Sequence, residues 1–247
     1  MRTTRVYTQQ PLEAGELVAL KGNAAQHLGR VLRARVGATV TLFNGDGKEF
    51  AATITASGKR ELQLTLGEAT LPGTESAVYT VLGLCLSRGD RFDWAVQKAT
   101  ELGVGSIVPL YSERVDFSIP EERLMKRIHH WQQVAISAAE QCGRVKIPLV
   151  IEPISLTSWV ADVSTDEKWV LHCADIGGYT VPSQKTGAPG SAALLIGPEG
   201  GLTDGEVSAA MRNSFAPLQL GPRVLRTETA PVVALTALSM QWGEMLG

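Results

Sequence analysis

Two segments near the C-terminus, residues 192–202 and 218–230, constrain the fold of this chain more than any other feature. Each begins with a short apolar run, typical of a strand buried on both faces of a parallel sheet. Each run ends abruptly in glycine, proline and charge before a helical pattern begins. Glycine permits positive φ and lets a ligand lie directly against main-chain amides. The two segments therefore predict an α/β protein with a small-molecule site.

Short-range signals predict that a helix begins after each loop. Thr203 is suited to the N-cap position and Glu206 to the third helical position, which together form a capping box. Pro231 fits the first turn of a terminal helix, because first-turn amides have no partner within the helix. The chain has neither G-x-x-x-x-G-K-[ST] nor a G-x-G-x-x-G after a strand, which argues against nucleoside triphosphate and dinucleotide sites. The alternative is that both loops are only tight strand-to-helix turns.

Four further motifs precede these loops. They are residues 27–33 (HLGRVLR), 97–104 (QKATELGV), 112–114 (SER) and 140–144 (EQCGR). With these motifs and the two loops, in this order, the chain resembles the trefoil-knotted SPOUT methyltransferases. Within that superfamily it is most similar to the bacterial 16S ribosomal RNA uridine N3-methyltransferases. The resemblance covers most of the chain, although residues 55–78 and 152–192 match only in pattern.

The first 72 residues predict a small β-barrel. Apolar runs at 39–43 and 49–55 flank residues 44–47 (NGDG), a strong hairpin signal, and Leu62, Leu64 and Leu66 alternate as in a strand. Asn23 is placed to cap a short helix. The resemblance implies that this domain, residues 1–72, is a PUA-like RNA-binding barrel. The alternative is a generic β module.

Residues 73–247 alternate strand and helix patterns, which predicts a mostly parallel sheet with helices on both faces. The expected strands are 78–86, 105–110, 149–151, 169–173, 192–196 and 218–220, and the expected helices are 91–102 and 121–142. The resemblance implies a SPOUT methyltransferase domain whose C-terminal loops thread into a trefoil knot. Physical reasoning alone would not propose a knot, since knots are nearly absent among folds.

The resemblance implies S-adenosylmethionine as the cofactor, held largely by main-chain hydrogen bonds. This cofactor already carries a reactive sulfonium, so the protein chiefly has to align the methyl group and exclude water. Glu199 is interpreted as structural, at a helix N-terminus, rather than as a proton acceptor. The implied cofactor-binding residues are Leu171, His172, Ile196, Gly197, Pro198, Glu199, Gly200, Gly201, Leu220, Gly221, Val224, Leu225, Arg226, Thr227, Glu228 and Thr229.

The acceptor implied by the resemblance, N3 of a uridine, bears a proton whose loss puts negative charge on the neighbouring carbonyl oxygens. Arg144 is the leading candidate to stabilise that charge, helped by Glu140 and Gln141. Glu140 and Arg144 lie four residues apart on one helix face, so the alternative is a simple surface ion pair. Arg226 and Glu228 are expected to form a second pair near the cofactor, with Thr229 orienting the loop.

Charge is divided unequally along the chain. The whole chain has a formal net charge of -2, whereas residues 1–70 carry a net +3. This asymmetry permits an N-terminal RNA-contacting module without requiring one. The candidate phosphate contacts are Arg30, Arg33, Arg88, Arg91, Lys98 and Arg114, each of which alternatively faces solvent.

Composition describes an ordinary globular protein, with 44% hydrophobic and 19% charged residues. Without a signal-like or long apolar segment, we expect a cytoplasmic location and no membrane partner. The three scattered cysteines, with no C-x-x-C, argue against disulfides and a metal site. The resemblance implies 16S ribosomal RNA or the assembled small ribosomal subunit as partner, and a homodimer. The alternatives are a 2′-O-ribose methyltransferase of the same superfamily and a non-catalytic RNA-binding assembly factor.

Overall fold

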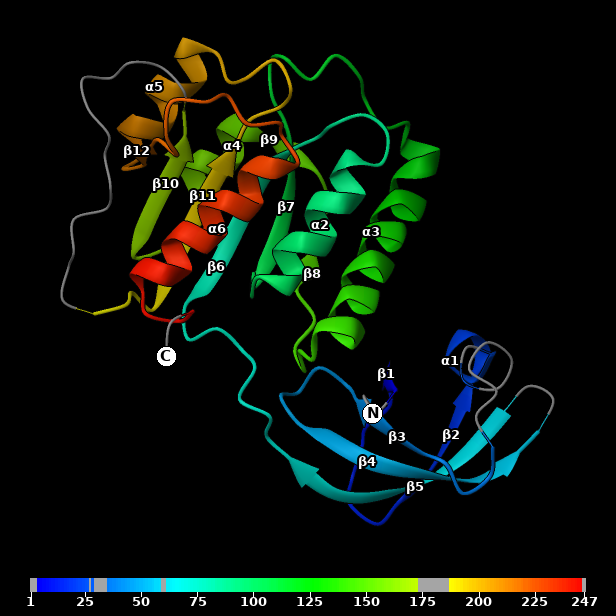
Figure 1. Ribbon diagram of the computed structural model, residues 1–247. Helices are drawn as coiled ribbons and strands as arrows, with labels where there is room; N and C mark the ends of the chain where they lie inside the picture. The colour runs from blue at the N-terminus through cyan, green and yellow to red at the C-terminus, as the bar shows by residue number, and fades with distance from the viewer. Residues whose placement is uncertain (1–3, 27, 29–34, 59–60, 173–186, 246–247) are drawn as a thin grey trace. The chain divides into compact units, whose positions relative to one another are not determined.

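The computed structural model describes residues 4–26, 28, 35–58, 61–172 and 187–245. The chain divides into two compact units (Figure 1). Unit 1 consists of residues 1–75 and 139–147, and unit 2 consists of residues 76–138 and 148–247. Residues 139–147 include the end of a long helix. They belong to the same unit as the N-terminal strands, although they are far from these strands in the sequence.

Unit 1 contains a curled sheet of five strands in the order β1-β3-β4-β5-β2. The strands are β1 (Arg5–Tyr7), β2 (Leu17–Lys21), β3 (Thr39–Phe43), β4 (Glu49–Ser57) and β5 (Glu61–Thr70). The β1–β3 pairing is parallel and the other pairings are antiparallel. Alternate side chains of the strands point into one apolar core, where Leu62, Leu64 and Leu66 are buried as their spacing predicts.

The predicted hairpin is confirmed, because β3 and β4 pair across residues 44–47. The predicted helix cap is wrong. Helix α1 runs from Gly22 to Gln26, so Asn23 lies inside the helix rather than before it. Residues 27 and 29–34, which include the candidate RNA contacts Arg30 and Arg33, lie outside the described residues.

Unit 2 has a seven-stranded sheet in the order β12-β10-β11-β6-β7-β8, with β9 also pairing with β7. All of these pairings are parallel, as predicted. The strands are β6 (Tyr79–Cys85), β7 (Ser106–Tyr111), β8 (Leu149–Val150), β9 (Ile154–Ser155), β10 (Glu167–Leu171), β11 (Ser191–Ile196) and β12 (Ala216–Leu218). The last strand thus ends where the sequence analysis expected it to begin.

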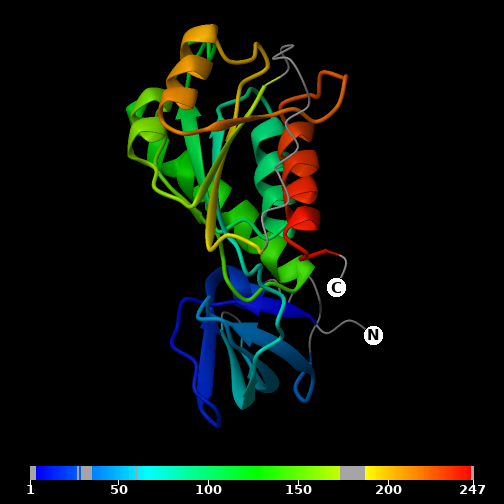
Figure 2. The same cartoon turned by 90° about the vertical axis from the view of Figure 1, so that its left-hand side faces the viewer.

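Helices cover both faces of this sheet (Figures 1 and 2). They are α2 (Arg91–Glu101), α3 (Glu121–Cys142), α4 (Leu156–Asp162), α5 (Asp204–Arg212) and α6 (Thr229–Gln241). Helices α2 and α6 pack together on one face, and α4 and α5 pack together on the other. Strand β11 lies between β10 and β6, and its residues Ala192 to Ile196 are almost fully buried. A strand buried on both faces leaves only its carboxyl end for a ligand, where the first loop begins.

Candidate functional site

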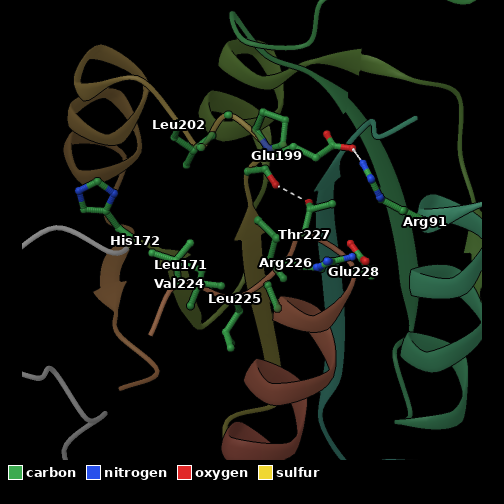
Figure 3. Close-up of a pocket in the computed structure, with 16 residues that line it drawn as sticks. Arg91, Leu171, His172, Glu199, Leu202, Val224, Leu225, Arg226, Thr227 and Glu228 are labelled. Carbon is green, nitrogen blue, oxygen red and sulfur yellow. Dashed lines mark hydrogen bonds and ion pairs between the residues drawn. The ribbon is translucent and has the colours of Figure 1, made fainter. Parts of the chain in front are cut away.

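A cavity of about 630 Å³ lies at the carboxyl ends of β10 and β11 (Figure 3). Residues from the end of β10, from the loop after β11 and from the loop before α6 line it. The lining residues are Arg91, Leu171, His172, Ile196, Gly197, Pro198, Glu199, Gly200, Gly201, Leu202, Val224, Leu225, Arg226, Thr227, Glu228 and Ala230. Most predicted cofactor residues thus gather around one cavity. Leu220, Gly221 and Thr229 belong to the same segments but are not among the lining residues.

The loop after β11 is close-packed against itself. A Cβ atom at Gly197 would lie 2.9 Å from Cγ and 3.2 Å from the backbone nitrogen of Leu202, and Gly201 adopts a φ of +71°. Both positions therefore require glycine. The predicted capping box is confirmed: Thr203 Oγ1 accepts from the Glu206 amide, and Glu206 Oε2 accepts from the Thr203 amide at 2.8 Å. The loop is consequently fixed at both ends.

Residues of the 112–114 motif hold this loop from outside. Arg114 Nη1 donates to the carbonyl oxygens of Gly200 at 2.7 Å and Leu202 at 3.4 Å. The amide of Glu113 donates to Oε1 of the buried Glu206 at 2.9 Å. Arg114 was predicted only as a phosphate contact. The sequence analysis missed its contact with the loop, since nothing in the pattern relates residues so far apart.

Thr227 joins the two loops of the cavity. Its buried hydroxyl donates to the carbonyl oxygen of Gly197 at 2.8 Å (Figure 3). The sequence analysis assigned the orientation of this loop to Thr229, and the hydrogen bond that joins the loops comes instead from Thr227. Helix α6 then begins at Thr229, as predicted. Because this hydrogen bond links the loop after β11 to the loop before α6, we expect a displacement of one loop to displace the other.

Three of the candidate RNA contacts are paired with carboxylates of the same unit. Arg91 Nη1 lies 2.7 Å from Oε1 of Glu199, and the amide of Arg88 donates to the same oxygen at 3.4 Å. The Arg88 guanidinium pairs with Asp116 at 3.0 Å. A third candidate RNA contact, Lys98, pairs with Glu101 at 2.8 Å. Glu199 is therefore held by Arg91 and by the Arg88 amide, and its structural role remains a prediction.

Glu228 differs from these charged groups. It is the N-cap residue of α6 and lines the cavity, and its Oε2 atom is buried without a hydrogen-bond partner among the described residues. The predicted ion pair with Arg226 is absent from the described part of the chain, so that expectation is wrong. The cavity thus contains a carboxylate oxygen for which the described ranges supply no partner.

Arg144 lies in unit 1, where its guanidinium pairs with Glu75. Nε and Nη2 of Arg144 donate to Oε2 of Glu75 at 3.0 and 2.8 Å, and the amides of Val145 and Lys146 donate to Oε1 at 2.8 and 2.9 Å. Arg144 is only 5% exposed, so its guanidinium does not lie at the surface as the alternative of a surface ion pair assumed. Burial alone would raise the pKa of Glu75, but hydrogen bonds from Arg144, Lys146 and Val145 and the charge of Arg144 lower it.

The rest of the 140–144 motif is fixed to the same unit. Glu140 Oε1 accepts from the amide of Tyr7 at 2.9 Å, and Arg5 Nη2 donates to the carbonyl oxygen of Arg144 at 3.0 Å. Phe43 forms an apolar cluster with Ala139 and Val145. Gln141 is exposed. Glu75, a linker glutamate with no motif around it, was not predicted, although it accepts hydrogen bonds from Arg144, Val145 and Lys146.

The described residues offer neither a metal site nor a membrane-spanning helix. Within these ranges no three histidine, cysteine, aspartate or glutamate residues form a group that could hold a metal ion. No helix in the described part of the chain is long and apolar enough to cross a membrane. Burial raises the pKa of the Cys85 thiol to about 12, with Ser112 opposing and Glu206 reinforcing the shift. Cys85 is therefore a neutral core residue at physiological pH.

Family models match both units of the chain. Residues 74–239 match the RNA methyltransferase domain, and residues 20–67 match the RNA methyltransferase PUA domain. Among curated proteins, the ribosomal RNA small subunit methyltransferase E of Synechocystis is 32% identical over 95% of this chain and 76% of its own length. The protein of the same name from Bacillus subtilis is 28% identical over 95% of this chain and 94% of its own length.

Two solved structures are similar over nearly the whole chain. A Legionella pneumophila protein described as a methyltransferase, solved with bound SAM, has a TM-score of 0.91 and 38% identity, covering 97% of this chain and 98% of that one. The ribosomal RNA small subunit methyltransferase E of Neisseria gonorrhoeae, bound to S-adenosylmethionine, has a TM-score of 0.86 and 34% identity, covering 98% of both chains.

Proposed function

This chain belongs to the RNA methyltransferase family that includes the ribosomal RNA small subunit methyltransferases E, and from that premise we propose that it methylates N3 of a uridine in 16S ribosomal RNA. In this proposal S-adenosylmethionine is the methyl donor. The observation that carries the proposal is the cavity formed by the two loops. Two similar proteins were solved with this cofactor bound, at 38% and 34% identity.

The cavity fits such a cofactor. Its volume of about 630 Å³ suits a nucleoside-sized ligand. Apolar side chains such as Leu171, Ile196 and Leu225 offer contacts to an adenine ring, and main-chain groups of residues 197–201 offer hydrogen bonds. When bound, S-adenosylmethionine supplies an electrophilic methyl group on a sulfonium. The chain then has to align the uracil, exclude water and remove the N3 proton.

Arg144 is the proposed stabiliser of negative charge on the uracil carbonyl oxygens, assisted by Glu140 and Gln141. Its planar guanidinium suits two adjacent acceptors better than an ammonium would. Glu75 binds the Nε–Nη2 edge and so fixes the orientation of the guanidinium plane. The same contact prevents rotation of the side chain, as a preorganised donor requires.

RNA binding is assigned to the barrel of unit 1 together with basic residues near the cavity. Arg88, Arg91, Lys98 and Arg114 are the described candidates, with Arg30 and Arg33 outside the described residues. Because Arg88 and Arg91 already pair with Asp116 and Glu199, RNA phosphates would have to compete with these carboxylates. Such binding should be sensitive to salt. The partner is 16S ribosomal RNA or the assembled small subunit, and the proposed location is the cytoplasm.

A homodimer forms part of the proposal. Helix α6 has no charged residue, and while Leu235 and Leu238 are buried, Met240 and the nearby Met245 are about half exposed. An apolar helix with an exposed side is a common dimer surface. Sedimentation equilibrium across a range of protein concentrations tests this point.

Methylation of purified RNA tests the activity. The protein is incubated with S-adenosylmethionine and either transcribed 16S ribosomal RNA or isolated small subunits, and digested nucleosides are identified by mass spectrometry. N3-methyluridine supports the proposal. A 2′-O-methylated nucleoside instead supports the ribose methyltransferase, and tight RNA binding without methylation supports an assembly factor. Calorimetric titration with S-adenosylmethionine tests cofactor binding independently of turnover.

A further inference from the structure

Glu228 presents an unusual group to the cavity. Its Oε2 atom is buried and has no hydrogen-bond partner among the described residues. Leaving a buried carboxylate oxygen unpaired costs free energy, so native structures rarely contain one without a reason. In a ligand cavity the usual reason is that the ligand supplies the missing donor. Glu228 thus contributes a carboxylate to the cavity lining, and one of its oxygens has a hydrogen-bonding capacity that the described residues leave unused.

The other carboxylate of the lining is already engaged. Glu199 accepts from Arg91 at 2.7 Å and from the amide of Arg88, and its side chain is 39% exposed. Glu199 would have to give up its ion pair with Arg91 in order to bind a proton from a substrate. Among the described lining residues, Glu228 is thus the carboxylate with an uncommitted oxygen shielded from solvent.

We propose that Glu228 is the general base that accepts the N3 proton of the uridine. The inference rests on the proposed function, whose substrate must lose this proton. The N3–H bond breaks and the proton moves to the carboxylate of Glu228, while the nitrogen electron pair forms the bond to the methyl carbon. The electrons of the broken S–CH₃ bond stay on sulfur, which becomes a neutral sulfide. Glu228 ends as a neutral carboxylic acid, so charge and atoms balance.

The location of Glu228 favours this chemistry. As the N-cap residue, Glu228 lies at the N-terminal end of α6, next to the loop that lines the cavity. The reaction then removes the positive charge of the sulfonium and the negative charge of the Glu228 carboxylate together. If RNA and cofactor together close the cavity to water, both charges are poorly solvated and their mutual removal is favoured.

Its place along the cavity also separates it from the adenosine. Figure 3 shows His172 and Glu228 on opposite sides of the lining. The proposed adenosine contacts include Leu171, His172 and the loop after β11. The side of the cavity with Glu228 is then left for the methyl group and for the uracil that accepts this group. The competing explanation for the unpaired oxygen is that Glu228 holds the positively charged cofactor. It predicts that Glu228→Gln weakens the affinity for S-adenosylmethionine.

Glu228→Gln tests the proposal, because it keeps the shape of the side chain and removes its basicity. Single-turnover methylation at saturating RNA and cofactor should slow at least about a hundredfold near pH 7. The residual rate should rise about tenfold per pH unit, because the uracil then has to ionise without help. RNA containing 5-fluorouridine, whose N3 is more acidic, should recover much of the loss. Glu228→Asp keeps a carboxylate and should recover part of the rate with ordinary uridine.

Calorimetry provides the readout that does not depend on turnover. Affinities of Glu228→Gln for S-adenosylmethionine and for the neutral S-adenosylhomocysteine should both stay within about threefold of the unsubstituted protein. The matched control is Glu122→Gln, which removes a carboxylate from the first turn of α3 and should leave the rate unchanged. Thermal melting confirms that each variant is folded.

Three outcomes overturn the base assignment. A wild-type rate in Glu228→Gln removes Glu228 from proton transfer while leaving the proposed function intact. A selective loss of affinity for S-adenosylmethionine, with S-adenosylhomocysteine binding unchanged, assigns Glu228 to the cofactor charge. If the unsubstituted protein forms no N3-methyluridine, the proposed function fails and the base assignment fails with it.

Discussion

The cavity loops of unit 2 and the 140–146 segment of unit 1 contain the same kinds of residue and use them in opposite ways. In the cavity, glycine exposes main-chain groups and Glu228 retains an oxygen unpaired among the described residues. In the 140–146 segment, Glu75 binds the guanidinium of Arg144 and two backbone amides. The difference teaches that a motif rich in glycine, arginine and glutamate does not itself reveal which of its charged groups already have a partner within the protein.

The comparison is tested most strongly by Arg144→Ala. If the guanidinium stabilises charge on the uracil, kcat should fall by about a hundredfold or more, while the affinity for S-adenosylmethionine barely changes. Arg144→Lys should rescue poorly, because an ammonium cannot reproduce a planar fork. Single-turnover rates measured well below the melting temperature separate this loss from instability. Wild-type turnover in the folded Ala variant would reduce Arg144 to a purely structural residue.

Glu75→Gln should produce the next largest effect, on stability. The change removes the negative charge that pairs with the buried Arg144 guanidinium, and breaking a buried ion pair typically costs about 3–5 kcal/mol. The carboxylate has a lowered pKa, so its contribution is complete above its ordinary value of 4.5 and is lost as pH falls through the lower folded value. Urea unfolding should therefore show a constant gap between wild type and variant near neutral pH. The gap should narrow in acid, and a gap that widened in acid would contradict the assigned pairing.

Local signals in the sequence were sufficient for many elements. Helix α3 has the predicted ends, since Pro120 precedes it and Gly143 follows it. The capping box at Thr203 and the hairpin over residues 44–47 were also predicted correctly. In each of these cases the residues that specify the structure are close together in the chain.

The remaining features depend on residues far apart in the sequence. The strand order around β11, the contact of Arg114 with Gly200 and the grouping of residues 139–147 with unit 1 have no local signature. Thr227 and Thr229 were both implied cofactor residues, and only the direction of their side chains, which has no local signature, assigns the hydrogen bond between the loops to Thr227. The resemblance, rather than periodicity, supplied the cofactor and the substrate.

Gly197→Ala tests the cavity half of the comparison, namely whether the loop after β11 requires glycine at this position. The added Cβ would lie 2.9 Å from Leu202 Cγ, so the loop must shift. Strain of this kind typically costs about 1–3 kcal/mol, and we expect the affinity for S-adenosylmethionine to fall by roughly tenfold or more. Gly200→Ala is the matched comparison, because its Cβ would contact only the flexible Arg114 side chain at 3.4 Å. Calorimetry should give a smaller loss there, and equal losses would show that packing against Leu202 is unimportant.

The smallest expected effect is that of Arg114→Met, which asks whether an exposed arginine near the cavity serves the loop or the RNA. Removing the guanidinium deletes its hydrogen bonds to Gly200 and Leu202, and we expect the affinity for S-adenosylmethionine to fall about fivefold, or about 1 kcal/mol. Arg88→Met is the control. The Arg88 guanidinium pairs with Asp116, so its removal should leave the affinity for the cofactor unchanged.

If Arg114 is instead a phosphate contact, Arg114→Met should leave the cofactor affinity unchanged and weaken RNA binding. The salt dependence of RNA binding should then become shallower by about one counterion. Calorimetry with the cofactor and RNA titrations at several salt concentrations distinguish the two, and loss of RNA binding alone would return Arg114 to the phosphate contacts.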